Sequence, residues 1–269
     1  MAEKLNLEAV AALLPSMGEA ALEVYETIDS TNLRCKALAA QGAAAGSAVA
    51  ADCQTAGRGS RGRSFASPEG QGVYLSVLLR PGCRAEEMQH LTAMAAVAVR
   101  EAILETCGLE TGIKWVNDLI CGGRKLCGIL VELAFAPDGT VSSAVVGAGV
   151  NCTQRREDFP TELQEMAGSV QLFTGVPVDR TALCAAMIRH LRALQEELFS
   201  GRETYLRRYA EHCVTIGGHV RVLGEQVREA EALGIDENAA LIVRYEDGSE
   251  DRIASGEVSV RGLYGYLDP

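Results

Sequence analysis

The hydrophobic pattern of the chain changes near residue 213, and this change restricts the possible folds more than any other feature. Before it, long apolar runs such as SAVAADCQT (47–55) and GVYLSVLLR (72–80) indicate buried strands. After it, the short segments HVRVLG, QVREAEALGI, ALIVRYEDG and VSVRG alternate between apolar and polar residues and are separated by glycines. We therefore predict a domain of strands and helices over residues 1–213 and a small all-β barrel or sandwich over residues 214–269.

Further elements of the first domain follow from periodicity and end signals. The segment EEMQHLTAMAAVAVREAILETCG predicts a helix that ends at Gly108, and DRTALCAAMIRHLRALQEELFSG predicts another between Asp179 and Gly201. The segments GIKWVND, LCGILVELAFA and SSAVVGAGVNC predict three more strands, and PDG between the last two predicts a hairpin turn.

Composition excludes several classes of protein. The formal net charge is −11, which argues against bulk affinity for nucleic acid or for an anionic membrane. No apolar run reaches the roughly 18 residues that span a bilayer. The nine cysteines include no C-x-x-C pair, and the four histidines show no zinc-like spacing. We expect a reduced, cytoplasmic protein without a structural metal.

Against this acidic background, one loop is strongly basic. TAGRGSRGRSF (55–65) places Arg58, Arg61 and Arg63 among three glycines. Glycines let backbone N–H groups approach a ligand, and arginines match phosphate or carboxylate, so the loop is a candidate anion site. It follows neither the P-loop nor the dinucleotide pattern. A solvated surface turn and an RG-rich RNA contact remain alternatives, and the second is disfavoured by the negative charge and the lack of interleaved aromatic residues.

Four other motifs are ambiguous when taken singly. GIKWVNDLI places Lys114, Asn117 and Asp118 at a strand end, where an ordinary Asn-Asp turn is an equal alternative. Lys125 opens an apolar strand, either as an edge gatekeeper or as a charge aimed into a cleft. GAGVN, which ends at Asn151, allows a flat ligand to approach the backbone or simply forms a tight turn. IDSTN (28–32) is sufficient to cap a helix.

Taken in order, DSTN, QTAGRGSRGRSF, KWVNDL, KLCGILVE, GAGVN and GEVSVRG resemble the signatures of biotin–protein ligases from about residue 22 to the end. The resemblance implies a mixed β-sheet catalytic domain with helices on one face, followed by an SH3-like barrel. It implies an enzyme that makes biotinyl-adenylate from biotin and ATP with Mg²⁺. The biotin is then transferred to a lysine of a carrier domain, such as the biotin carboxyl carrier protein of acetyl-CoA carboxylase.

The resemblance also assigns residues to roles. Its biotin contacts fall on Ser30, Thr31, Asn32, Gln54, Arg58, Gly59, Ser60 and Lys125. Its nucleotide contacts fall on Arg63, Phe65, Lys114, Asn117 and Asn151. The catalytic set it implies is Lys125, Arg58, Arg61 and Asp118. Lys125 is expected between the biotin carboxylate and the α-phosphate. Asp118 is expected to take a proton from the carrier lysine, with magnesium binding as the competing role.

The chain departs from the family pattern at three positions: one arginine position of the basic loop, one aromatic position and one turn position. Ser60 replaces an arginine, which predicts a looser grip on the adenylate unless Arg61 compensates. Phe65 replaces a tryptophan and Val116 a proline. Few residues precede the match, so we expect no DNA-binding domain and no repressor role. Lipoate–protein ligation is the nearest alternative activity, and a non-catalytic effector- or RNA-binding protein is the alternative class. Both a monomer and a homodimer are compatible with the sequence.

Overall fold

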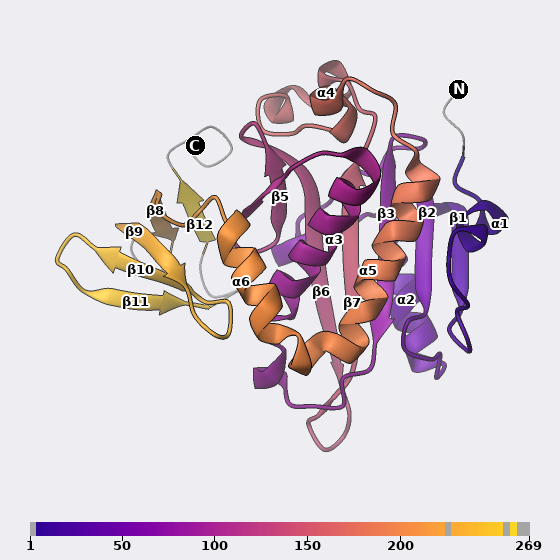
Figure 1. Cartoon of the computed structure of the whole chain (residues 1–269), viewed down its shortest axis with the longest axis horizontal. Helices are drawn as coiled ribbons and strands as arrows, with labels where there is room; N and C mark the ends of the chain where they lie inside the picture. Colours follow the sequence, from indigo (N-terminus) through magenta and orange to yellow (C-terminus); the bar gives the residue numbers. More distant parts are fainter. Residues whose placement is uncertain (1–3, 224–226, 255–258, 263–269) are drawn as a thin grey trace.

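A seven-stranded mixed sheet forms the framework of the larger part of the molecule (Figure 1). The structure is a computed structural model that describes residues 4–223, 227–254 and 259–262. Strands β1 and β2 pair in parallel and the remaining neighbours are antiparallel. In spatial order, the strands are β1 (Leu22–Ile28), β2 (Ala48–Gln54), β3 (Gly72–Leu79), β7 (Val141–Asn151), β6 (Arg124–Phe135), β5 (Asp118–Cys121) and β4 (Gly112–Lys114).

Helices α3 (Leu91–Cys107) and α5 (Arg180–Ser200) cover one face of this sheet (Figure 1). Each helix begins or ends where the sequence predicts. Gly108 ends α3 in the left-handed conformation, and the Asp179 carboxylate accepts a hydrogen bond from the Ala182 N–H at the start of α5. Gly201 interrupts the second helix, but its φ of −89° stays right-handed, and α6 (Arg202–His212) follows at once. The sequence signals had not indicated α6.

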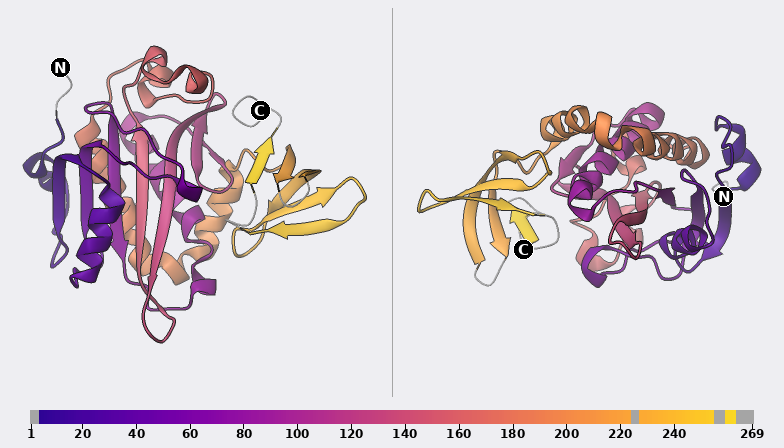
Figure 2. Two further views of the ribbon diagram at one scale, coloured as in Figure 1. Left: turned by 180° about the vertical axis from the view of Figure 1, so that it is seen from behind. Right: turned by 90° about the horizontal axis from the view of Figure 1, so that it is seen from below.

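Helix α2 (Thr31–Ala40) lies on the opposite face of the sheet (Figure 2). Because side chains alternate along a strand, successive residues of β2 and β3 serve the two faces. Ala48 and Val77 pack in the main core with α3 and α5, whereas Val49 and Leu78 pack under Leu38 of α2. The helical layer expected on one face is therefore present, and α2 adds a small second layer that leaves room beside it for a site.

The remaining helices are short. They are α1 (Leu7–Ala12), α4 (Val170–Thr174) and the 3₁₀ turns η1 (Ser60–Gly62), η2 (Ala85–Met88), η3 (Arg156–Asp158) and η4 (Thr161–Leu163).

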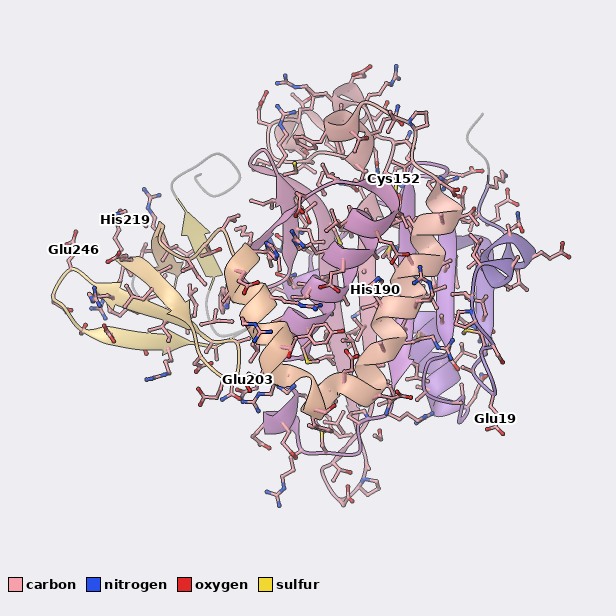
Figure 3. All side chains as sticks on the ribbon, in the orientation of Figure 1. Glu19, Cys152, His190, Glu203, His219 and Glu246 are labelled. Carbon is pink, nitrogen blue, oxygen red and sulfur yellow. The ribbon has the colours of Figure 1, made fainter. Side chains whose placement is uncertain are left out.

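Charged groups line the outer surface of the long helices α3 and α5. There, His190 Nε2 of α5 lies 2.9 Å from Glu105 Oε2 of α3 (Figure 3). Within the described ranges, no helix is long and apolar enough to cross a membrane.

A second, five-stranded antiparallel sheet follows α6. Its spatial order is β11 (Glu250–Ile253), β10 (Leu241–Tyr245), β9 (Val227–Ile235), β8 (His219–Leu223) and β12 (Ser259–Gly262). The sequence predicted four of these strands and missed β11. The boundary predicted near residue 213 falls between α6 and β8 and stays a prediction. Residues 255–258 and 263–269 of the predicted second domain, and with them part of GEVSVRG, lie outside the described residues.

The segment expected as one strand, GIKWVND, is two strands joined by a turn. Strand β4 ends at Lys114 and β5 begins at Asp118. The turn is held by residues that follow α6, because Trp115 Nε1 donates to the Ala239 carbonyl, between β9 and β10, and the Trp115 N–H donates to Thr215 Oγ1, before β8, both at 2.9 Å. These bonds to the all-β part explain why the strand does not continue.

Candidate active site

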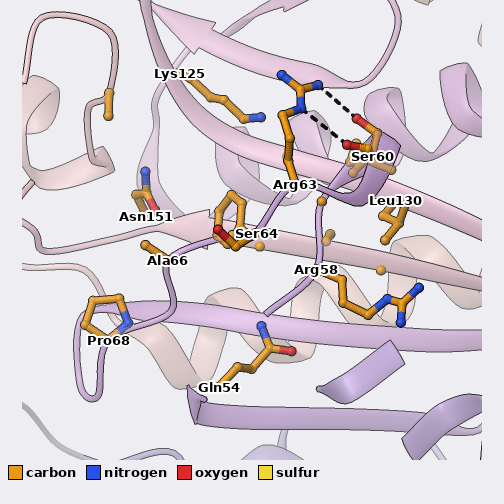
Figure 4. Close-up of a pocket in the computed structure, with 18 of the residues that line it drawn as sticks. Gln54, Arg58, Ser60, Arg63, Ser64, Ala66, Pro68, Lys125, Leu130 and Asn151 are labelled. Carbon is orange, nitrogen blue, oxygen red and sulfur yellow. Dashed lines mark hydrogen bonds between the residues drawn. The ribbon is translucent and has the colours of Figure 1, made fainter. Parts of the chain in front are cut away.

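The loop of residues 55–71 folds over the sheet beside α2 and closes a cavity of about 280 Å³ (Figure 4). The cavity collects most of the residues singled out from the sequence. Those that line it are Ser30, Thr31, Asn32, Gln54, Arg58, Gly59, Ser60, Arg63, Phe65, Asn117, Lys125 and Asn151. They come from the start of α2, the end of β2, the basic loop, the β4–β5 turn and strands β6 and β7. Residues up to 121 positions apart in the chain, from Ser30 to Asn151, thus meet at one site.

One end of the cavity is uncharged and polar. The Thr31 N–H donates to Gln54 Oε1 at 2.9 Å, and the Gln54 amide donates to Ser67 Oγ at 2.9 Å. Ser76 Oγ lies 2.8 Å from Thr31 Oγ1 and 2.6 Å from Asn32 Oδ1. Thr31, Asn32 and Ser76 are all buried, so their hydrogen bonds are made in a site with little water, where they fix side-chain orientation.

Glu132 of β6 forms the outer end of this polar group. One carboxylate oxygen accepts from Asn32 Nδ2 at 2.9 Å, and the other lies 3.2 Å from both Lys36 Nζ and Arg58 Nη2. Burial alone would raise the pKa of Glu132, but the hydrogen bonds from Asn32 and Lys36 and the nearby positive charges lower it below its ordinary value. Glu132 is therefore an anion at neutral pH, and it holds the first arginine of the loop.

Lys125 supplies a positive charge on the other side of the cavity. Its Nζ lies 2.6 Å from Asp118 Oδ1 and 6.0 Å from the centre of the Phe65 ring. Its backbone is fixed on both sides, because its N–H donates to the Met166 carbonyl at 2.7 Å and its carbonyl accepts from the Gly168 N–H at 2.9 Å. The lysine is thus held rigidly with its ammonium group at the cavity wall.

The glycines of GAGVN form the floor under Phe65. A Cβ atom at Gly149 would lie 2.6 Å from the Phe65 ring, and one at Gly128 of the neighbouring strand would lie 3.3 Å from it. A Cβ atom at Gly147 would overlap Asn32 Oδ1. The sequence interpretation of these glycines as allowing close approach therefore applies first to the protein's own side chains. Asn151 beside them donates to the Gly168 carbonyl at 3.0 Å.

The three loop arginines have different surroundings, and Figure 4 shows two of them, Arg58 and Arg63. Arg58 and Arg63 line the cavity and point in different directions. Arg63 donates to the Ser60 carbonyl at 3.3 Å and to Ser60 Oγ at 3.2 Å, so Arg63 places a cation against Ser60. Arg61 is exposed and has a left-handed backbone, with a φ of 59°.

Three predicted residues do not line the cavity, namely Arg61, Lys114 and Asp118. Asp118 reaches the site through its ion pair with Lys125. Lys114 lies opposite Asp118 in the register of the antiparallel strands β4 and β5. The catalytic and nucleotide-binding roles expected for these residues stay predictions.

Sequence reasoning missed Glu132 and Ser76. Each had a weak signal, since Ser76 is the one polar residue within the apolar run VYLSVLL and Glu132 ends the quoted motif KLCGILVE. It also missed the wall formed by Gln154, Phe159 and Met166. These residues lie in turns after β7, where no periodic pattern marks them.

Comparison with known proteins agrees with this arrangement. Residues 24–151 match the Biotin/lipoate A/B protein ligase family, and residues 215–261 match the Biotin protein ligase C terminal domain. The Bifunctional ligase/repressor BirA of Bacillus subtilis is 34% identical over 242 residues, which cover 88% of this chain and 73% of that protein. The Biotin--[acetyl-CoA-carboxylase] ligase of Mycobacterium tuberculosis is 32% identical over 206 residues, which cover 75% of this chain and 74% of that protein.

A solved structure extends the similarity to three dimensions. The biotin protein ligase from Aquifex aeolicus in complex with biotin and ATP has a TM-score of 0.77 and 28% identity, and the match covers 90% of this chain and 99% of that chain. The resemblance first seen in the sequence motifs is confirmed at the level of whole domains, and so is the fold class. The chain belongs to the biotin protein ligase family, a family of enzymes.

Proposed function

We propose that this protein joins biotin to ATP as biotinyl-adenylate and then transfers the biotin to a specific lysine of a biotin carboxyl carrier domain. One observation carries the proposal. A single cavity combines an uncharged polar end around Thr31 and Gln54 with cationic groups on Lys125, Arg58 and Arg63. Biotin has a polar ureido ring at one end and a carboxylate at the other, and the arrangement matches both ends.

The cations fit the first step of the reaction. A carboxylate oxygen attacks the α-phosphorus of ATP, the bond to the β-phosphate oxygen breaks, and pyrophosphate leaves. Two anions must approach each other, and negative charge builds up on the phosphate oxygens, so fixed positive groups in a partly closed cavity lower the barrier. Magnesium enters with ATP as part of the substrate. Lys125, which is held at both backbone groups, is the residue that we assign to the carboxylate and the α-phosphate.

Asp118 prepares Lys125 for this role by holding its ammonium group at 2.6 Å. In the second step the carrier lysine must lose a proton before its amine attacks the mixed anhydride, because that amine is mostly protonated at neutral pH. AMP then leaves. Acceptance of the proton by Asp118, and magnesium binding by Asp118, both stay predictions. The glycine-rich loop, with Arg63 and Ser60 in contact, would cover the adenylate and exclude water.

Intact-mass spectrometry of an apo biotin-acceptor domain tests the proposal. The domain is incubated with this protein, ATP, magnesium and biotin, and lipoate replaces biotin in a parallel tube. We expect a gain of one biotinyl group with biotin alone. The Lys125→Ala variant should lose about 10²–10³ in rate, as enzymes do when a group that stabilises developing charge is removed. Lys4→Ala, an exposed lysine outside the cavity, is the matched control.

Three outcomes would count against the proposal. Modification with lipoate but not biotin would move the activity to the alternative branch of the family. The absence of both carrier modification and adenylate formation would refute the assignment of the cavity. Full activity in Lys125→Ala would refute the role of the lysine. That the protein does not act as a repressor stays a prediction, which a gel shift showing salt-sensitive, specific DNA binding would overturn.

A further inference from the structure

A continuous run of hydrogen bonds crosses the polar end of the cavity, from Glu132 on β6 to Gln54 on β2. Asn32 Nδ2 lies 2.9 Å from Glu132 Oε2, and Asn32 Oδ1 lies 2.6 Å from Ser76 Oγ. Ser76 Oγ lies 2.8 Å from Thr31 Oγ1, and the Thr31 N–H donates to Gln54 Oε1 at 2.9 Å. The run therefore has four links that join five side chains and one backbone N–H group, each of hydrogen-bond length.

The number of hydroxyl protons in this run determines which group donates and which accepts in each hydrogen bond. A carboxylate only accepts, so Glu132 obliges Asn32 to turn its NH₂ group outward and its Oδ1 toward Ser76. Ser76 has a single O–H, and the oxygen–oxygen distance of 2.6 Å to Asn32 requires that proton. The Thr31 O–H then donates to Ser76 Oγ at 2.8 Å rather than to Gln54 Oε1 at 3.1 Å, because the shorter oxygen–oxygen contact needs the proton more. In the opposite direction, the Ser76 and Asn32 oxygens would face each other at 2.6 Å with no proton between them.

The direction decides what the cavity offers to a ligand. Thr31 and Asn32 both line the cavity, and in this direction the hydroxyl proton of Thr31 is used by Ser76. The unused lone pairs of Thr31 Oγ1 and Asn32 Oδ1 remain as acceptors. We propose that Glu132 is a positioning residue that, through Asn32 and Ser76, keeps this end of the cavity lined with acceptors and so selects a ligand that presents N–H donors. This inference rests on the proposed function, in which the donors are the ureido N–H groups of biotin.

A glutamine at position 132 would remove this control. Glu132 Oε1 is held between Lys36 and Arg58, each 3.2 Å away, so the oxygen of a glutamine side chain would turn toward these two cations. Its NH₂ group would then face Asn32, whose amide must flip to accept from it. After the flip the Asn32 NH₂ faces Ser76, Ser76 donates to Thr31, and Thr31 donates to Gln54 Oε1, which lies 3.1 Å from its hydroxyl. The whole run reverses, and an amide donor replaces an acceptor at Asn32.

The test compares biotin with its cyclic carbamate analogues, in which one ring N–H is replaced by an oxygen acceptor. Each is titrated calorimetrically without ATP and then assayed for carrier modification. We expect the wild-type protein to prefer biotin by at least about a hundredfold, because the carbamate oxygen would face acceptors. In Glu132→Gln the ratio of the two affinities should narrow by at least about tenfold, which one misplaced hydrogen bond accounts for. Ser76→Ala, which interrupts the run at its middle, should narrow it as well.

Lys36→Met is the matched control, since Lys36 contacts the same carboxylate but not Asn32, and it should keep the wild-type ratio. A merely structural role for Glu132 would weaken both ligands equally and leave the ratio unchanged, and this result would overturn the inference while carrier biotinylation by the wild type continues. A wild-type protein that binds no biotin would instead refute the proposed function, and this inference with it. Thermal melting confirms that each variant is folded.

Discussion

The ion pair between Arg180 and Asp52 gives a sharp test of how the site is supported. Arg180 is the first residue of α5, and its Nη1 lies 2.5 Å from Asp52 Oδ1 on β2 and 3.2 Å from the Gly72 carbonyl. Both side chains are almost wholly buried, at 4% and 0% exposure. Asp52 also accepts from the Gly70 N–H at 3.0 Å, so the pair fixes the end of the loop over the cavity.

We predict that Arg180→Met destabilises the protein strongly, because it leaves the Asp52 carboxylate buried without its cation. Breaking a buried pair by removing one partner costs about 3–5 kcal/mol. The Gly70 N–H still hydrogen bonds to the carboxylate, so we expect the lower end, about 3 kcal/mol. For a domain of this size each kcal/mol lowers Tm by about 2–4 °C, which gives a fall of about 6–12 °C.

Thermal unfolding followed by circular dichroism measures this shift. The matched control is Arg189→Met, on the same helix, which removes an exposed pair with Glu105 and should cost about 1 kcal/mol or less. Adding Asp52→Asn to Arg180→Met should recover part of the lost stability, since no buried charge is then left unpaired. An Arg180→Met variant as stable as Arg189→Met would refute the reasoning, as would a double variant less stable than Arg180→Met alone.

Two further predictions concern the cavity floor and pH. Gly147→Ala should weaken biotin binding by about 10–100-fold, the equivalent of an overpacking cost of about 1–3 kcal/mol, because the added Cβ overlaps Asn32 Oδ1. Gly234→Ala, in a strand with no atom within 4 Å of the added Cβ, should leave binding unchanged in the same calorimetric titration. Burial lowers the pKa of His90, whose Nε2 donates to the Leu198 carbonyl at 2.9 Å. The stability contributed by neutral His90 is then complete above the unfolded pKa of about 6.5 and is lost as the pH falls below it. The melting temperature of the wild type should therefore fall more steeply than that of His90→Gln between pH 7.5 and 5, and parallel curves would contradict this.

Local signals predicted the elements well, and motif order predicted which of them surround the cavity. Gly108, Asp179 and the PDG turn mark ends that depend on nearby residues only, and the structure places all three as expected. The interruption after Lys114 was not predictable in the same way. It depends on hydrogen bonds from Trp115 to Thr215 and Ala239, which are 100 and 124 residues away in the chain.

The contacts inside the site were the least predictable part. Arg58 and Arg61 belong to the same motif and have the same chemistry, yet Arg58 lines the cavity and pairs with Glu132, whereas Arg61 has a left-handed backbone and does not line the cavity. Spacing along a loop does not determine which side chain turns inward, because that depends on the position of an acidic side chain on another strand. Glu132 is 74 residues from Arg58, and only the folded sheet brings the two together.

The glycine-rich stretch of β7 has a consequence for how this strand accumulates change. Val146 and Val150 face the main core, where substitution by another apolar residue of similar volume destabilises the protein only modestly. Gly147 and Gly149 face the cavity, where the smallest added carbon meets Asn32 or Phe65. We therefore expect β7 to tolerate exchanges among aliphatic residues on its core face, and to tolerate no residue larger than glycine at positions 147 and 149 on its cavity face.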